Sequence, residues 1–439
     1  MARKFHERKA LHAQTMRRRQ KFAKAKIPAY DPAPPVRAAT RGPRHHFFGD
    51  NDRCPWSPSG RYLLAMETPF GHRVPAADDI ADVGVVDLEY AGRYISLADT
   101  TAWNWRRGAA VQWLPDRQDP DCFLFHRFAG KKLVSAVLDT QCRLQREYDR
   151  PLYALAPDGS RAVALDCRRL TAWRPAYGYA AFGAGERGAP DTADDGIWLV
   201  DMASGKAKLV LSFRALREWA CDRPERVGGA CVYRPAFSPD GRRLAFLYAS
   251  QSDTAPIHRQ LLTLSVDGND LYCVARGFVS HFAWLPDNTI LTWCGLPAGA
   301  IVPPAGTGWF ARMRRWADRF SHARRMRALR PGYRLFRDGA SPLRDIGAAW
   351  LTEPGHPVPA ANGRRLIADT GAGKRKDGSL VLYDMDLDRA GLLGVFPVAP
   401  ALTETVPCRL NPRLSPDGKQ IAFDACHEGT RQIYLMDIG

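Results

Sequence analysis

The sequence predicts an all-β protein, namely a seven-bladed β-propeller with a basic N-terminal tail and a helical insertion in its fifth blade. Two observations lead to this prediction. A Pro-Asp-Gly-like turn recurs along the chain, and a strand-like apolar run follows each copy of the turn. The length of 439 residues does not require a second domain, because all-β rings are long as single units. We therefore expect residues 35–439 to form one propeller.

The repeated turn is the clearest signal in the sequence. Proline presets the first turn angle, aspartate bonds back to the backbone, and glycine or asparagine accepts a positive φ, so each copy should join two strands. The copies lie at 57–60, 114–116, 156–159, 238–241, 285–288, 361–363 and 415–418. The copies that begin at Ser57, Ala156, Ser238 and Ser415 follow the pattern most closely. One hairpin for each copy predicts one blade for each copy.

A third strand is expected after each hairpin. The apolar runs lie at 83–88, 133–138, 196–201, 260–264, 333–336, 380–384 and 432–437. The last run ends just before Gly439, so the outer strand of the last blade should come from the N-terminal side, around Val36 to Arg44. Such a strand would close the ring and cover an open sheet edge. An ordinary β-sandwich with recurrent turns is the alternative architecture.

The charge balance favours an acidic partner. The chain has 63 Lys and Arg against 46 Asp and Glu, which gives a formal charge of +17. Anionic lipid and anionic polysaccharide both suit this charge. Nucleic acid also suits the charge but is only a minor alternative, because the chain contains no recognisable RNA- or DNA-binding module. No apolar stretch reaches the roughly 18 residues of a membrane span, so the chain is predicted to be cytoplasmic, either free or peripheral to the inner membrane.

Two segments stand apart from the repeat. Residues 1–34 form a basic stretch that is expected to be a disordered tail. Within residues 303–331, Trp309, Met313, Trp316 and Phe320 recur at helical spacing between arginines, which predicts an amphipathic helix. Its aromatic side, within residues 309–326, would either pack on the propeller as a lid or meet an anionic membrane surface.

Longer strings between the turns point to one subgroup of propellers. They are His45-His-Phe-Phe-Gly49, Cys54-Pro-Trp-Ser57, Gly60-Arg-Tyr-Leu-Leu64, Ala102-Trp-Asn-Trp105, Gln112-Trp-Leu-Pro115, Pro175-Ala-Tyr-Gly-Tyr179, Asp194-Asp-Gly-Ile-Trp198, Val279-Ser-His-Phe282 and Phe423-Asp-Ala-Cys-His-Glu-Gly429. Through these strings the chain, from about His45 to its C-terminus, resembles the TolB-like, oligogalacturonate-lyase-like propellers.

The resemblance implies a divalent cation, manganese by preference, at the mouth of the central channel. That cation binds the uronate carboxylate, a nearby base removes the C5 proton, and β-elimination expels the 4-linked sugar. His281 matches one ligand of the family, and Glu353 with His356 matches the pair in Glu-Pro-Gly-His. Asn411 stands where the family has a histidine. An amide supplies only a neutral oxygen, so metal binding is expected to be weak or absent.

Other departures from the family pattern introduce arginines. Arg106 and Arg107 replace a Gln-Gln pair, and Tyr233-Arg234 stands where the family has the histidine taken for the proton-transfer residue. Guanidinium groups suit carboxylate, sulfate or phosphate, so Arg106 and Arg107 are expected to bind the substrate. Tyr233 and Arg234 are the candidates that would lie near the abstracted proton.

Two further residues complete the expected substrate site, His46 and Arg413. The site predicts an anionic oligosaccharide or another acidic ligand in the central pocket, and, if the chain is an enzyme, a metal-dependent carbon–oxygen lyase. The alternative is a non-catalytic propeller that binds a protein or a glycan, for example in surface-polysaccharide assembly at the membrane.

Overall fold

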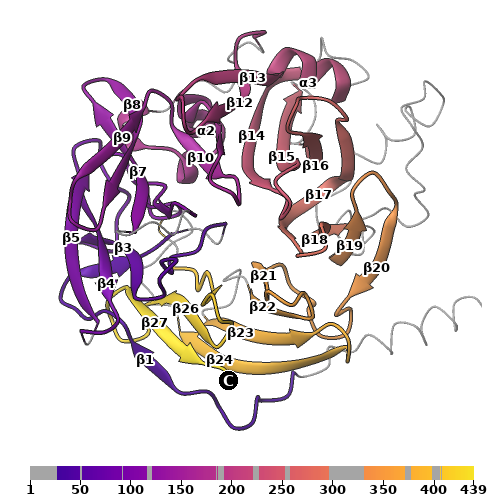
Figure 1. Cartoon of the computed structure of the whole chain (residues 1–439). Helices are drawn as coiled ribbons and strands as arrows, with labels where there is room; N and C mark the ends of the chain where they lie inside the picture. The colour runs from indigo at the N-terminus through magenta and orange to yellow at the C-terminus, as the bar shows by residue number, and fades with distance from the viewer. Residues whose placement is uncertain are drawn as a thin grey trace, which may run out of the picture.

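The structure is a computed structural model. It describes residues 27–49, 52–90, 92–115, 121–183, 185, 192–220, 227–252, 258–295, 331–370, 377–397, 406 and 408–439. Within these ranges the chain is built almost wholly of antiparallel strands, and the sheets are arranged around a ring (Figure 1). The predicted all-β architecture is confirmed.

The described strands form five four-stranded sheets and one seven-stranded sheet. The first sheet contains β2 (His45–Phe47), β3 (Tyr62–Thr68), β4 (Ala81–Asp87) and β5 (Arg93–Thr100). The second contains β6 (Gln112–Trp113), β7 (Cys122–Ala129), β8 (Lys132–Asp139) and β9 (Leu144–Tyr148). The third contains β10 (Leu152–Leu155), β11 (Arg161–Ala164), β12 (Gly196–Asp201) and β13 (Ala207–Ser212).

The seven-stranded sheet follows along the chain. It contains β14 (Val227–Phe237), β15 (Arg243–Ser252), β16 (His258–Ser265), β17 (Tyr272–Trp284), β18 (Thr289–Gly295), β19 (Gly332–Arg337) and β20 (Pro342–Ile346). Its long middle strand, β17, serves two partners. Residues 272–277 of β17 pair with β16, and residues 278–284 pair with β18.

The remaining two sheets complete the ring. One contains β21 (Pro357–Pro359), β22 (Arg365–Thr370), β23 (Asp377–Asp384) and β24 (Arg389–Pro397). The other contains β25 (Arg413–Leu414), β26 (Gln420–Ala425), β27 (Gln432–Asp437) and, as its fourth strand, β1 (Val36–Ala38). Val36 pairs with Met436 and Ala38 with Tyr434, which confirms that the outer strand of the last sheet comes from the N-terminal side.

The predicted turns form as expected. In six of the seven copies the turn is closed by the same backbone hydrogen bond, as from Gly60 N to Ser57 O and from Gly241 N to Ser238 O, both at 2.9 Å. The glycines of these turns have positive φ, for example 79° at Gly60, which explains their presence. The remaining turn runs into residues 116–120, which lie outside the described residues.

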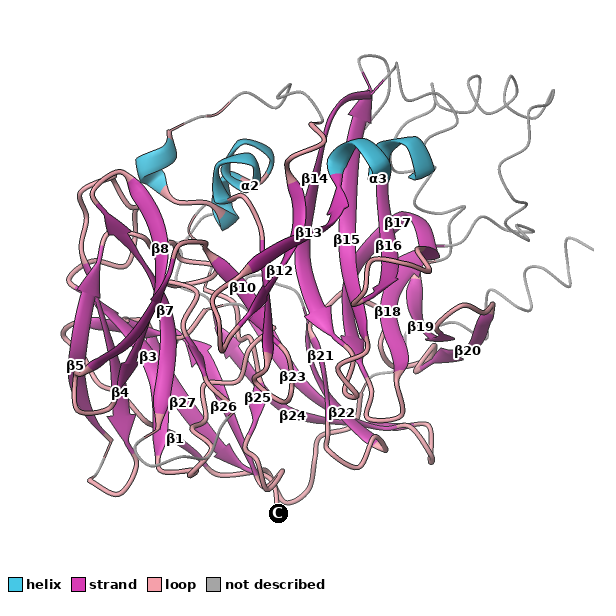
Figure 2. Ribbon diagram, turned by 45° about the horizontal axis from the view of Figure 1, so that its top comes forward, coloured by secondary structure: helices cyan, strands magenta, loops and turns pink. Residues whose placement is uncertain are grey.

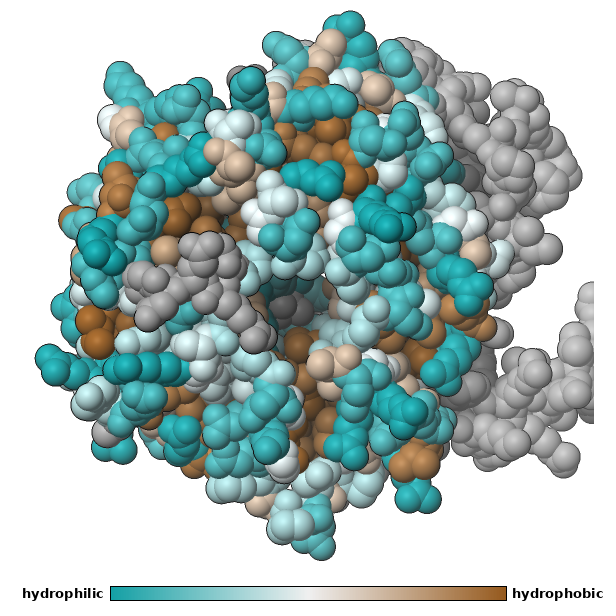
Figure 3. All heavy atoms as spheres, in the orientation of Figure 1, coloured by the Kyte–Doolittle hydropathy of each residue, from teal (hydrophilic) through white to brown (hydrophobic). Residues whose placement is uncertain are grey.

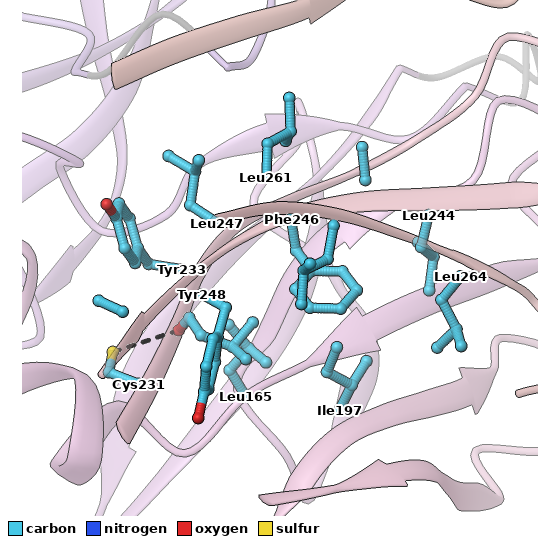
Figure 4. Packing of buried hydrophobic residues seen from close by; sticks show 14 of the residues in the cluster. Leu165, Ile197, Cys231, Tyr233, Leu244, Phe246, Leu247, Tyr248, Leu261 and Leu264 are labelled. Carbon is cyan, nitrogen blue, oxygen red and sulfur yellow. Dashed lines mark hydrogen bonds between the residues drawn. The ribbon is translucent and has the colours of Figure 1, made fainter. Parts of the chain in front are cut away.

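The core lies between the faces of neighbouring sheets. Middle strands such as β18 are buried along their whole length, because both faces of each sheet pack on a neighbour. One large cluster joins the third sheet to the seven-stranded sheet, and Figure 4 shows Leu165, Ile197, Phe246 and Tyr248 gathered within it. Two helices, α2 (Cys167–Trp173) and α3 (Phe213–Ala220), lie at one end of the strands (Figure 2). The helix α2 begins where the Asp166 carboxylate accepts a hydrogen bond from Arg168 N at 2.7 Å.

The two segments outside the repeat are only partly described. Residues 1–26 and the insertion at 303–330 lie outside the described residues, so the helix at 309–326 and its membrane contact stay predictions. Residues 28–30, part of the segment expected to belong to the tail, instead lie along β24. Ala29 forms a bridge with Leu392, and Tyr30 N donates to Leu392 O at 2.9 Å. Among the helices described, none is long and apolar enough to cross a membrane.

Candidate functional site

An arginine-rich cavity of about 190 Å³ is the strongest candidate site. Its lining residues come from distant parts of the chain: Arg106, Arg174, Tyr177, Tyr233, Arg234, Arg259, Val279, Ser280, His281 and Arg409. Five of these are arginines, and none of the described lining residues is acidic. The face of the molecule drawn in Figure 3 is hollowed near the middle of the ring. We refer to this site as the arginine cavity.

A β-bulge brings Tyr233 and Arg234 to the same cavity. In a regular strand, successive side chains point to opposite faces, so two neighbours could not both line one pocket. In β14 the pairing shifts between Tyr233 and Ala236, which leaves an extra residue on this strand. Arg234 adopts a φ of 54°, an uncommon conformation for a residue other than glycine. The bulge therefore redirects the side chains toward the cavity, as bulges do beside many active sites.

A second bulge acts in the same way on β17. The pairing of β17 with β18 shifts between Val279 and Phe282. Val279, Ser280 and His281 all line the arginine cavity, although they are consecutive in the strand. The Ser280 hydroxyl lies 2.8 Å from Nδ1 of His281 and so helps to orient the imidazole ring.

The arginines are ordered by aromatic side chains. Nη1 of Arg106 donates to the Tyr177 hydroxyl at 2.9 Å, and its guanidinium carbon lies 4.7 Å from the Tyr177 ring centre. The guanidinium carbon of Arg174 lies 4.6 Å from the ring centre of Tyr233. Cation–π contact stabilises positive charge at these two positions. The charges of Arg106 and Arg174 are therefore held against aromatic rings at the lining of the cavity.

Neither of the predicted proton-transfer residues suits that role. Burial raises the pKa of Tyr233 above its ordinary value, so the phenol keeps its proton near neutral pH. The guanidinium of Arg234 cannot lose a proton under these conditions. Both side chains line the cavity as expected, and there each carries hydrogen-bond donors rather than a base.

Solved structures of other proteins share the architecture of this chain. A structure of oligogalacturonate lyase from Vibrio parahaemolyticus superposes with a TM-score of 0.56 at 13% identity, over 94% of this chain and 96% of that one. Oligogalacturonate lyase in complex with manganese gives a TM-score of 0.57 at the same identity and coverage. The fold is that of an oligogalacturonate-lyase-like β-propeller. TolB from Acinetobacter baumannii matches over 77% of the chain at 14% identity with a TM-score of 0.35. No protein-family profile matches the chain, and no curated protein sequence matches it.

Two of the predicted metal ligands meet in this lyase-like propeller. The ring centres of His281 and His356 are 4.2 Å apart. His356 is fully buried, and its Nδ1 lies 2.9 Å from the carboxylate of Asp369 on β22. Asp369 also accepts the backbone N–H of His356 at 2.6 Å. A carboxylate behind a histidine fixes the orientation of the ring, and Nε2 of His356 is then the nitrogen that a metal would use.

The other two predicted ligands do not complete a metal site. Among the described residues, no group of three His, Cys, Asp or Glu side chains could hold a metal ion, so Glu353 does not form a triad with the two histidines. Asn411 has a φ of 42°, and its amide nitrogen donates to Gly49 O at 2.8 Å. The amide therefore anchors a loop. Two imidazoles beside an arginine-lined cavity do not fit a divalent cation, because such sites usually require more ligands, including anionic ones.

Three predicted substrate-binding residues lie outside the arginine cavity. His46 is buried between Gln432 Oε1 at 3.0 Å and Glu67 Oε2 at 2.8 Å. The guanidinium of Arg413 donates to the backbone oxygens of Arg53, Asn411 and Pro412. Both side chains connect strands and loops of the scaffold.

Arg107 is the third of these residues. It is 1% exposed, and its guanidinium carbon lies 3.8 Å from the ring centre of Tyr153. The Tyr153 hydroxyl in turn accepts Arg234 N at 3.3 Å. Arg107 therefore supports the position of Arg234 rather than lining the cavity.

Sequence reasoning missed six of the ten lining residues. These six line the cavity without having been predicted as site residues: Arg174, Tyr177, Arg259, Val279, Ser280 and Arg409. Two signals were present. Tyr177 lies in one of the strings shared with the lyase-like family, and Arg409 precedes Asn411 by two residues. Neither signal indicates which way the side chain points, because the cavity forms only where several sheets meet in the folded chain.

Proposed function

We propose that this propeller binds an anionic oligosaccharide, of the uronate class, with an acidic group in the arginine cavity. The observation that carries the proposal is the lining: five arginines and no acidic side chain among the described lining residues. Guanidinium groups bind carboxylates through paired, charge-assisted hydrogen bonds. The hydroxyls of Tyr177, Tyr233 and Ser280 add neutral groups that suit sugar hydroxyls.

The size of the cavity supports one acidic sugar unit at a time. A volume of about 190 Å³ is below the range of pockets that enclose a drug-sized ligand. The neighbouring sugars of an oligosaccharide would then lie along the mouth of the ring. A small cavity with many positive charges favours selection by charge rather than by the shape of a long chain.

Replacing Arg234 or Arg106 with glutamine is expected to weaken binding of a galacturonate oligomer by about 10- to 100-fold. The reason is the loss of one charge-assisted hydrogen bond, about 1.5–3 kcal/mol. Isothermal titration calorimetry at low and high salt measures this change, because added salt should also weaken the wild-type complex. Arg337→Gln is the matched control, since Arg337 is exposed at the end of β19. Equal losses in the control and the cavity variants, or equal binding of a neutral galactose oligomer, would refute the proposal.

One observation favours a second candidate function, a carbon–oxygen lyase. His281 is the one imidazole among the described lining residues, and it lies in the cavity with the arginines. An imidazole is the side chain best suited to remove a proton near neutral pH. In β-elimination the C5 proton would pass to His281, the electron pair of the C5–H bond would form the C4=C5 double bond, and the C4–O bond would break with its electron pair leaving on the sugar oxygen. That oxygen would take a proton from the His281 imidazolium or from water. The arginines would stabilise the negative charge that develops at the carboxylate.

The lyase candidate is tested by the ultraviolet absorbance of the unsaturated uronate that elimination forms. We expect His281→Ala to abolish this signal while oligomer binding persists. If wild-type protein binds the oligomer and produces no unsaturated product, the non-catalytic binding function stands alone. We also infer that the propeller has seven four-stranded blades, with β14–β17 and β17–β20 as two blades that share β17.

A further inference from the structure

Arg409 contributes a positive charge to the cavity that contains His281, one of the predicted metal ligands. It precedes β25 and lines the arginine cavity together with His281. The ring of His281 contacts the ring of His356, and His356 is bonded to the buried carboxylate of Asp369. The guanidinium of Arg409 and the carboxylate of Asp369 therefore belong to one charged cluster that contains both histidines.

The contacts of this cluster set the positions of its charged groups. The Asp369 carboxylate lies 2.9 Å from Nδ1 of His356 and accepts the backbone N–H of His356 at 2.6 Å. The guanidinium of Arg409 keeps its charge at any accessible pH and lines the same cavity as His281. A positive charge is therefore already present on the side of the histidines that faces the cavity.

We propose that Arg409 supplies the positive charge that a divalent cation would otherwise supply beside His281 and His356, so that this propeller binds its anion without a metal. A cation beside the histidines would face the charge of Arg409 as well as the other four arginines of the cavity. Like charges repel strongly when little water separates them. The inference concerns the metal alone and holds whatever anion the cavity takes.

The position of Asn411 agrees with this proposal. Its amide nitrogen is bonded to Gly49 O, which holds the loop that carries Arg409 against the segment after β2. A histidine at position 411 would add a ligand but leave the guanidinium of Arg409 in place. Restoring that histidine alone is therefore expected to leave metal binding weak.

Metal titrations of the full chain test the proposal, with Co²⁺ followed by its visible absorption and Mn²⁺ by the paramagnetic resonance of the free ion. Wild-type protein and Asn411→His are expected to bind both ions more weakly than about 1 mM. Arg409→Gln combined with Asn411→His should bind at least about tenfold more tightly, because the repulsion is removed and a ligand is added. His281→Ala in that background should abolish the gain.

Two controls distinguish the effect of the position of Arg409 from the effect of the total positive charge of the cavity. Arg409→Lys in the Asn411→His background keeps the charge and should bind no metal, whereas Arg259→Gln in that background removes a different arginine from the same cavity and should gain much less. The proposal is overturned if Arg259→Gln gains as much as Arg409→Gln. It is also overturned if wild-type protein binds either ion at micromolar concentration and the His281→Ala variant does not. That comparison uses only these two proteins, so it remains decisive even if the other variants fail to fold. No glycan is present, so failure of the glycan proposal leaves this test unaffected.

Discussion

Deleting residues 1–44 is expected to abolish cooperative folding of the propeller. The deletion removes β1, the fourth strand of the sheet that contains the C-terminus. It also removes the bonds from Ala39 N to Ile433 O at 2.8 Å and from Gln432 Nε2 to Arg44 O at 2.8 Å. The edge of β27 would then be open to other chains, so aggregation should accompany the loss of stability. Calorimetry and light scattering measure both effects.

Deleting residues 1–26 is the control for this experiment. That deletion leaves β1 and all of the bonds just named in place. We expect the shorter deletion to retain a single cooperative transition. An unchanged melting temperature after deletion of residues 1–44 would show that β1 contributes little, and the ring would then need no strand from the N-terminal side.

Replacing Asp424 with asparagine is expected to stabilise the protein above neutral pH. Asp424 is buried on β26, and its Oδ1 accepts Phe48 N at 3.2 Å. Burial raises the pKa of this carboxyl to about 7, against about 3.9 in an unfolded chain. Between these two values the folded state binds more protons than the unfolded state, so stability is lost as pH rises toward 7. The full difference of about three pKa units corresponds to about 4 kcal/mol.

Asparagine preserves the oxygen that accepts Phe48 N and cannot ionise. The variant should therefore unfold at higher urea concentration than wild-type protein at pH 8, and this advantage should shrink toward pH 4. Asp377→Asn removes the same charge from an exposed position at the start of β23 and should show no such pH dependence. If Asp424→Asn is instead less stable at pH 8, the carboxylate is ionised and held by Arg413 and Arg431, whose charges both act to lower its pKa.

The candidate site was only partly predictable from the sequence. Arg106, Tyr233, Arg234 and His281 were predicted as site residues, and all four line the arginine cavity. His46 and Arg413 have the same chemistry as true site residues, yet their bonds go to the scaffold. Residue type alone cannot separate these cases, because a buried charged or titratable group is held as readily by neighbouring strands as by a ligand.

The sequence by itself determined the repeat. Proline, aspartate and glycine act within four consecutive residues, so the turns at Ser57 or Ser238 require no knowledge of the rest of the chain. The alternation of apolar runs with these turns then determined the all-β architecture.

Only the tertiary structure decided which side chains meet. The cavity joins residues from Arg106 to Arg409, and it depends on the bulges at Arg234 and in β17 that turn consecutive side chains to one side. A shift of one residue in strand pairing sends a side chain to the opposite face, and such a shift depends on the neighbouring strand as well as on local sequence. The position of Arg409 beside His281 was likewise invisible along the chain, because it arises where the loop before β25 meets β17 across the ring.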